Sequence, residues 1–233
     1  MTEGGRGRRP RRDAEANRER LLAAAVTVML REGRDVPLAT IAAEAGVGIG
    51  TLYRRYADRQ ALMHDLEHRA YDLLVGILAE IDGTGGTGLD SVGEYLARCF
   101  AVGDQLVLPL HGAPPLMTPE AVRARATIDR RLNDHLDRGR ADGSIRADVN
   151  ATDVIAFAAL ITQPLSYGPD WPRMVRRQIA LFLNSLASDG AVPGPPIRQD
   201  DIEGASPATP PLMDKVPGCG WQSRARRGSS GAM

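Results

Sequence analysis

The segment from residue 38 to residue 56, LATIAAEAGVGIGTLYRRY, constrains the fold of this 233-residue chain more than any other part of it. Ile41, Ala42 and Ala45 recur at the spacing of one helix face, and Gly46 then allows a chain reversal that a Cβ would resist. A second short helix follows the glycine. Two short helices joined by a glycine-containing turn predict a helix-turn-helix, whose second helix enters the major groove of DNA.

Arginines gather directly before this segment. They stand at positions 6, 8, 9, 11, 12, 18 and 20, against the acidic residues at positions 13, 15 and 19. The whole chain has 29 basic and 29 acidic residues, so the positive charge is local, as expected beside a duplex. We expect residues 1–12 to form a disordered basic arm. Its arginines either enter the minor groove or act as a solvated charge run that strengthens binding nonspecifically.

From Arg18 to Leu62 the chain resembles the amino-terminal domain of the TetR family of bacterial transcriptional regulators. The residues IAAEAGVGIGTLYRRYADRQAL stand where that family has its most recognisable motif. The resemblance implies a sequence-specific DNA-binding repressor that a small-molecule ligand releases from a palindromic operator. The chain departs from the family pattern at Gly48 and Pro37, where hydroxyl residues that often meet phosphate are common.

The resemblance also implies particular DNA contacts. The family position of Tyr53 commonly holds a phosphate, and that of Arg59 does likewise; the alternative for Tyr53 is a half-buried aromatic of the small core. Arg54 and Arg55 are adjacent and cannot share a helix face, so we expect one of them, Arg54, to reach DNA at a guanine edge. Tyr56 is expected to pack into the small core instead. The full expected set of DNA-binding residues is Arg8, Arg9, Thr40, Gly48, Ile49, Gly50, Thr51, Tyr53, Arg54 and Arg59.

Composition favours an all-α fold, because 43% of the residues are apolar and only 4% aromatic, which is typical of Ala/Leu/Val cores between packed helices. We expect a three-helix DNA-binding domain over residues 13–60, with its first helix at 13–32. A helical ligand-binding and dimerisation bundle should cover residues 61–187, beginning with a helix capped by Asp58. Further helices are expected at 89–101, 104–111, 119–140, 151–161 and 171–187. Residues 188–233, rich in Pro and Gly, should form a disordered tail.

The last two expected helices are apolar over more than one face, and excess apolar surface requires a partner. In the resembled family these helices pair with their copies in a four-helix dimer interface, so we expect a homodimer. The alternative is that other helices of the same chain cover the apolar faces. Within the bundle, the candidate ligand-binding residues are Tyr95, Cys99, His111 and Gln163.

Residues 64–68, HDLEH, match the H-x-x-E-H pattern of zinc proteases, with His64, Glu67 and His68 as the reacting set. Because this stretch falls on the fourth helix of a TetR-like domain, we expect a solvated face there, with no metal, cofactor or enzymatic activity. Two alternatives remain: a zinc hydrolase and a nonspecific architectural DNA-binding protein.

The two cysteines form no disulfide framework, and no apolar run is long enough to span a membrane or to form a signal peptide. These features predict a cytoplasmic protein.

Overall fold

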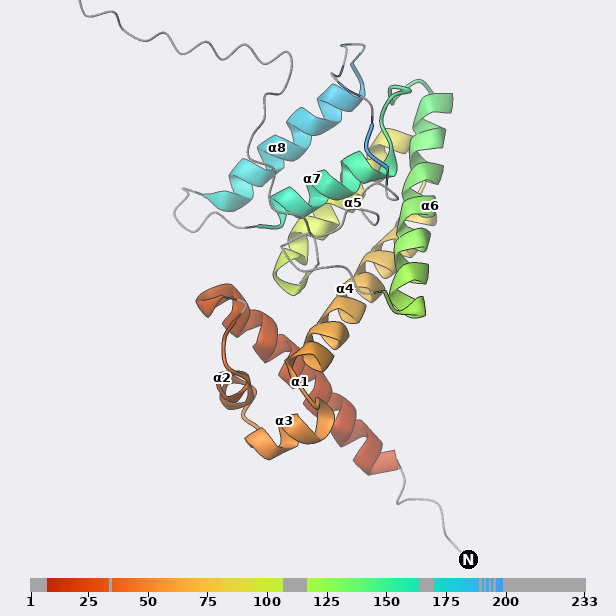
Figure 1. Ribbon diagram of the computed structural model, residues 1–233. Helices are drawn as coiled ribbons and strands as arrows, with labels where there is room; N and C mark the ends of the chain where they lie inside the picture. Colours follow the sequence, from red (N-terminus) through yellow and green to blue (C-terminus); the bar gives the residue numbers. More distant parts are fainter. Residues whose placement is uncertain are drawn as a thin grey trace, which may run out of the picture.

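The computed structural model describes residues 8–33, 35–106, 117–163 and 170–188, together with residues 190, 192, 194 and 196–198 (Figure 1). Every regular element in these ranges is a helix, which confirms the all-α fold class. The α-helices are α1 (Arg8–Glu32), α2 (Leu38–Glu44), α3 (Ile49–Arg55), α4 (Arg59–Asp82), α5 (Gly88–Ala101), α6 (Pro119–Ala141), α7 (Ala151–Ile161) and α8 (Trp171–Leu186). A short 3-10 helix, η1 (Gly103–Gln105), follows α5.

Two hydrophobic cores lie among the described residues, and α4 contributes to both. Its first turns place Leu62 and Leu66 in a core with α1, α2 and α3, and its later turns place Leu74 and Leu78 in a second core with α5 to α8. Figure 1 shows α4 running from the lower helices into the upper bundle. The expected boundary after residue 60 falls at the start of this shared helix, although Leu62 and Leu66 still pack in the first core.

The helix ends follow local sequence chemistry. The Asp58 carboxylate accepts a hydrogen bond from the Ala61 amide at 2.8 Å and so caps α4, as expected. Thr87 with Asp90, and Asn150 with Asp153, form reciprocal capping boxes at the starts of α5 and α7. These side chains satisfy backbone amides that a helix start leaves without partners, and so fix where each helix begins.

Helix α1 begins at Arg8, so the expectation of a disordered arm is wrong for residues 8–12. Arginine is a good helix former. Pro10 lies in the first helical turn, where a missing amide hydrogen costs no helical hydrogen bond. Residues 1–7, and the side chains up to residue 13, lie outside the described part of the chain.

The helix expected at residues 104–111 differs from the structure where the two can be compared. The structure has η1 at Gly103–Gln105, and residues 107–116 lie outside the described ranges. Most of the predicted disordered tail lies outside them as well. Within the tail, the carbonyl of Ile197 accepts a hydrogen bond from Asn150 Nδ2 at 2.8 Å, so a short piece returns to the start of α7.

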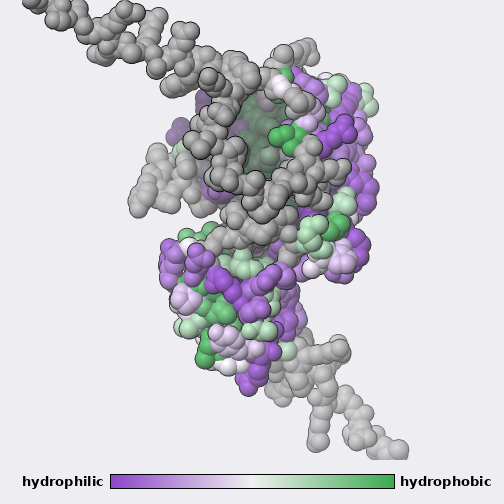
Figure 2. All heavy atoms as spheres, viewed as in Figure 1, coloured by the Kyte–Doolittle hydropathy of each residue, from purple (hydrophilic) through white to green (hydrophobic). Residues whose placement is uncertain are grey.

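The chain's own bundle covers much of the apolar surface that the sequence places on the last two helices, and part of that surface remains exposed. Buried residues on α7 and α8 include Val154, Ala158, Ile161, Val175, Ile179 and Leu186. Phe157 and Phe182 stack on each other at 4.1 Å between ring centroids and pack against the same core. Leu160 and Leu181 remain exposed, at 67% and 49%. The flank formed by α6 is largely hydrophilic in Figure 2.

Candidate nucleic-acid interface

The turn between α2 and α3 closes through backbone hydrogen bonds that require a left-handed residue. Gly46 has φ +66°, its amide donates to the Ala43 carbonyl at 3.0 Å, and the Val47 amide donates to the Ala42 carbonyl at 3.0 Å. This pair of bonds is a Schellman motif, which ends α2 and reverses the chain. Glycine adopts the conformation without the strain of a Cβ, so the turn predicted from Gly46 forms as expected.

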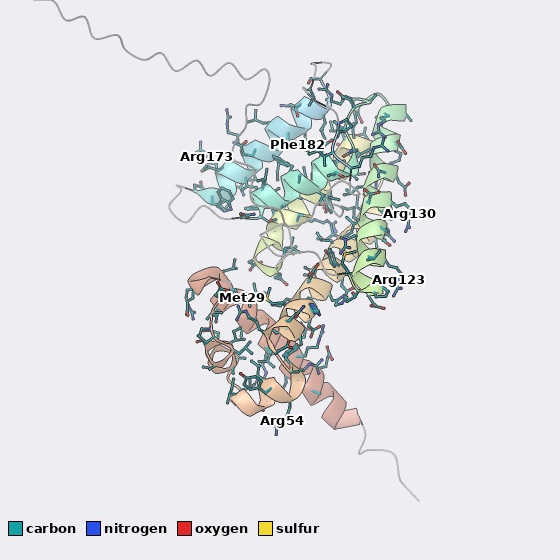
Figure 3. All side chains as sticks on the ribbon, viewed as in Figure 1. Met29, Arg54, Arg123, Arg130, Arg173 and Phe182 are labelled. Atoms are coloured by element: carbon teal, nitrogen blue, oxygen red, sulfur yellow. The ribbon has the colours of Figure 1, made fainter. Side chains whose placement is uncertain are left out.

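Helix α3 directs most of its side chains away from the protein. Within this helix, which the structure describes in full, Leu52 is the one buried residue. Ile49 and Tyr53 are 42% and 54% exposed, and Arg54 and Arg55 are exposed as well. Figure 3 shows Arg54 at the end of the molecule remote from the bundle. A short helix that is anchored at one position and open elsewhere presents a surface for contact with another molecule.

The start of α3 is open to close approach. No described atom would lie within 4 Å of a Cβ built at Gly48 or Gly50. Gly48 is the N-cap of α3 and has no side-chain oxygen, as the sequence implies. Pro37 is the N-cap of α2 and makes no side-chain capping hydrogen bond either. Thr40, on α2, is half-buried.

Two side chains of the expected DNA-binding set, Arg54 and Arg59, donate hydrogen bonds within the protein. Arg54 donates to the Thr51 hydroxyl at 3.0 Å, one turn earlier on α3. Arg59 donates to the Val36 carbonyl at 2.5 Å and so joins the start of α4 to the loop before α2. Its other terminal nitrogen, Nη2, is buried without a hydrogen-bond partner among the described residues. A phosphate contact from Arg59 therefore stays a prediction, and it would compete with the bond to Val36.

The carboxylate of Asp65, on α4, connects the C-terminal end of α3 to α4 and α1 through hydrogen bonds. Asp65 accepts hydrogen bonds from the Tyr56 hydroxyl at 2.6 Å and from Arg18 Nε and Nη2 at 2.9 and 2.5 Å. Burial raises the pKa of Asp65, but the hydrogen bonds from Arg18 and Tyr56 outweigh burial, and the pKa lies below its ordinary value. Tyr56 is 4% exposed, which confirms its expected place in the core.

Sequence reasoning missed Asp65 and Arg18 as parts of this arrangement. Their positions are 47 residues apart, and both residue types are ordinary on helix surfaces, so the sequence held no signal for the pairing. One turn further along α4, Arg69 lies 3.6 Å from the Glu19 carboxylate and donates to Gln105 Oε1 at 3.3 Å. Arg69 thereby joins α1 to η1.

The candidate ligand residues do not come together as one group among the described residues. Tyr95 and Cys99 are buried on α5, where burial raises the pKa of the Cys99 thiol to about 12 and raises that of Tyr95 well above its usual value. Gln163 is exposed beyond the end of α7. His111 lies outside the described residues.

The zinc-protease pattern lies on α4, and two of its side chains have partners in the protein. Glu67 is 7% exposed and accepts a hydrogen bond from the Tyr71 hydroxyl at 2.8 Å. His68 Nε2 lies 3.4 Å from the hydroxyl of Thr118, the N-cap residue of α6. The described residues contain no group of three or more His, Cys, Asp or Glu side chains that could hold a metal ion. Among the described helices, none combines the length and apolar character that crossing a membrane requires.

Comparison with known proteins gives a family match at the helix-turn-helix. The family model described as bacterial regulatory proteins, tetR family, matches residues 21–66, and no curated protein matches the chain significantly. The TetR transcriptional regulator SCO0520 from Streptomyces coelicolor is 31% identical, with 74% of this chain and 99% of that chain covered, at a TM-score of 0.48.

Two further structures support the fold comparison. The TetR transcription regulatory protein from Mycobacterium vanbaalenii is 26% identical, with coverage of 76% and 98% and a TM-score of 0.52. The TetR-like regulator LfrR from Mycobacterium smegmatis, solved in complex with proflavine, is 21% identical, with coverage of 76% and 98% and a TM-score of 0.60. Both alignments extend through the bundle as well as the first four helices.

A helix-turn-helix with an open second helix, mounted on a helical bundle, defines a DNA-binding transcriptional regulator. Within this class, the chain belongs to the TetR family of bacterial regulatory proteins.

Proposed function

We propose that the protein is a homodimeric repressor that binds a palindromic operator through α3 and releases it when a small molecule binds in the bundle. The observation behind this proposal is the exposure of α3. Leu52 is the one buried residue of this helix, and four of its large side chains are exposed. The sequence of α3, IGTLYRR, contains two basic and no acidic residues, which suits a polyanionic partner. Binding and release involve no chemical reaction, so no catalytic group is assigned.

On DNA, the exposed side chains of α3 divide into two roles. Tyr53 is assigned to a phosphate and Arg54 to a guanine edge, where a bidentate contact discriminates between bases. The remaining proposed contacts surround them on α2, at the start of α3, at the start of α4 and on the first turn of α1. They are Thr40, Gly48, Ile49, Gly50, Thr51, Arg59, Arg8 and Arg9.

Dimerisation is proposed through α7 and α8. Leu160 and Leu181 are exposed on these consecutive helices, and a two-fold axis beside them would bury both pairs. Such a dimer offers two copies of α3 to successive major grooves, which explains why the proposed operator is palindromic.

Ligand control is proposed from the shared helix α4. Because α4 packs in both cores, a ligand that moves its bundle end also shifts α3, which is held to α4 through Tyr56 and Asp65. Related structures hold small molecules: LfrR was solved with proflavine, and AibR with isovaleryl coenzyme A and operator DNA. The ligand site proposed for this chain lies in the bundle, with Tyr95, Cys99, His111 and Gln163 as its candidate residues.

Selection of bound sequences from random duplex DNA tests the proposal. The purified protein should enrich a palindrome. Tyr53→Ala should weaken binding to all sequences, whereas Arg54→Ala should cost about 1–3 kcal/mol at the selected site and relax discrimination at one position. Arg130→Ala is the matched control, because Arg130 is exposed on α6, away from α3 (Figure 3).

Two results would contradict the proposal. Binding without enrichment of any sequence would favour a nonspecific architectural protein. Wild-type affinity in both α3 variants at the selected palindrome would mean that another surface reads the operator.

A further inference from the structure

Ile49 is a large apolar side chain that is partly exposed at the start of α3. It is 42% exposed, and its chain neighbours Gly48 and Gly50 have no side chains to cover it. The next residue on the same face, one helical turn later, is Tyr53, which is 54% exposed. The outward face of α3 therefore combines an aliphatic group with an aromatic one beside the basic Arg54.

Isoleucine suits a fixed apolar contact. A β-branched side chain in a helix has one strongly preferred χ1 rotamer, so its methyl groups keep their direction and lose little freedom on binding. The open space at Gly48 and Gly50 allows another molecule to approach these methyl groups closely. The Arg54 guanidinium donates to the Thr51 hydroxyl, so a hydrogen bond holds this neighbouring cation in place.

The chemistry of the duplex restricts what such a side chain can recognise. An aliphatic group makes no hydrogen bond to a phosphate or to the polar edges of guanine, adenine or cytosine. The apolar group that base pairs display in the major groove is the C5-methyl of thymine. On the basis of the function proposed above, we propose that Ile49 reads the C5-methyl group of one thymine in each half-site of the operator.

This assignment separates three kinds of contact along one helix. Tyr53 positions the protein on the backbone, Arg54 selects a guanine, and Ile49 selects thymine over cytosine and over any base without a methyl group. The preference of Ile49 is small for each half-site, because one methyl group contributes roughly a fourfold change in affinity. A two-fold dimer applies it twice, which multiplies to roughly sixteenfold.

Deoxyuridine tests the proposal, because it differs from thymidine only by the absent C5-methyl group. Each thymine of the selected operator is replaced in turn, symmetrically in both half-sites, and affinity is measured by fluorescence anisotropy. The wild-type protein should lose roughly sixteenfold at one position. Ile49→Ala should bind the thymine and deoxyuridine forms of that position equally, whereas Ile49→Val, which stays β-branched, should retain a preference for thymine.

Leu30→Ala is the control, because Leu30 is a 55% exposed aliphatic residue of the same domain. Its neighbour Met29 lies at the end of α1 remote from Arg54 (Figure 3). This variant should keep the wild-type response to deoxyuridine. Unchanged wild-type binding to every deoxyuridine duplex, or an undiminished thymine preference in Ile49→Ala, overturns the assignment of Ile49 while the operator itself is still bound. Failure to select any operator overturns the proposed function as well.

Discussion

The carboxylate of Asp65, on α4, accepts hydrogen bonds from side chains of two other segments. Tyr56 brings the end of α3 and Arg18 brings α1, and both lie within 3 Å of its oxygens. Hydrogen bonds to a charged, partly buried group are among the stronger interactions in a protein. The orientation of α3 therefore depends on a carboxylate of another helix, α4.

Asp65→Asn should lower the free energy of unfolding by about 2 kcal/mol at neutral pH, because the amide keeps the shape but loses the charge. The pKa of Asp65 is lowered from 3.8 in the folded protein. Its stabilising contribution is therefore full above the unfolded value and disappears as the pH falls through the lower folded value. Urea titrations at pH 7 and in steps below pH 4 should show the gap between wild type and variant closing.

The exposed Asp72, on the same helix, provides the control. Asp72→Asn should change stability by less than about 0.5 kcal/mol at either pH. A gap for Asp65→Asn that does not depend on pH would contradict an ionic role for that carboxylate.

At the scale of elements, the bundle depends on one unusually close contact between α5 and α6. A Cβ built at Gly88 would lie 2.2 Å from the Gly139 amide nitrogen and 2.4 Å from the His135 carbonyl oxygen. These are backbone atoms, so no side-chain rotation can relieve the clash. Glycine at the start of α5 is therefore required by packing and not by backbone dihedral angles.

Gly88→Ala should destabilise the protein by about 1–3 kcal/mol, because α5 and α6 must move apart. Thermal unfolding followed by circular dichroism measures the effect. Gly76→Ala on α4 is the matched control, because a Cβ there would meet no described atom within 4 Å. It should leave stability unchanged or raise it by up to about 1 kcal/mol through helix propensity. Equal melting temperatures for the two variants would refute the close contact.

The elements that the sequence predicts well are those with local signals. Gly46 and Asp58 each act within a few residues of themselves, and the structure has each of them in the expected role. The start of α1 was missed because a run of arginines suits both a charged arm and a helix. Contacts between distant segments, such as that of Arg18 with Asp65, depend on packing that periodicity does not encode.

In the candidate site, too, some features are predictable from local sequence and others depend on contacts between distant segments. Ile49, Tyr53 and Arg54 belong to the DNA-binding set expected from the sequence, and all three are exposed on a short helix whose buried residue is Leu52. The engagement of Arg59 with the Val36 carbonyl was not predictable, because it depends on how the loop before α2 folds back onto α4.

At the scale of the whole molecule, the proposed dimer depends on a smaller apolar surface than the sequence suggests. Phe157, Phe182 and most neighbouring apolar residues pack within the bundle, so Leu160 and Leu181 supply the main exposed apolar groups of α7 and α8. An interface built on few anchors is sensitive to single changes at those anchors.

Leu160→Asp combined with Leu181→Asp should therefore yield a monomer, because unpaired carboxylates would be buried at the interface. Sedimentation velocity at micromolar concentration measures the change, and affinity for the palindrome should fall with it. Val122→Asp is the control, since Val122 is an exposed apolar residue of α6. A double variant with the same sedimentation coefficient as the wild-type protein would exclude this face as the interface.

The sharing of α4 between two cores also has a thermodynamic consequence. If α4 unfolds, apolar residues of both cores become exposed to solvent. The two cores should therefore unfold together, in a single cooperative thermal transition. A compound that binds only in the bundle would then raise the melting temperature of the helix-turn-helix too, even while it lowers affinity for DNA. Heat resistance and operator occupancy would thus change in opposite directions on binding of the same molecule.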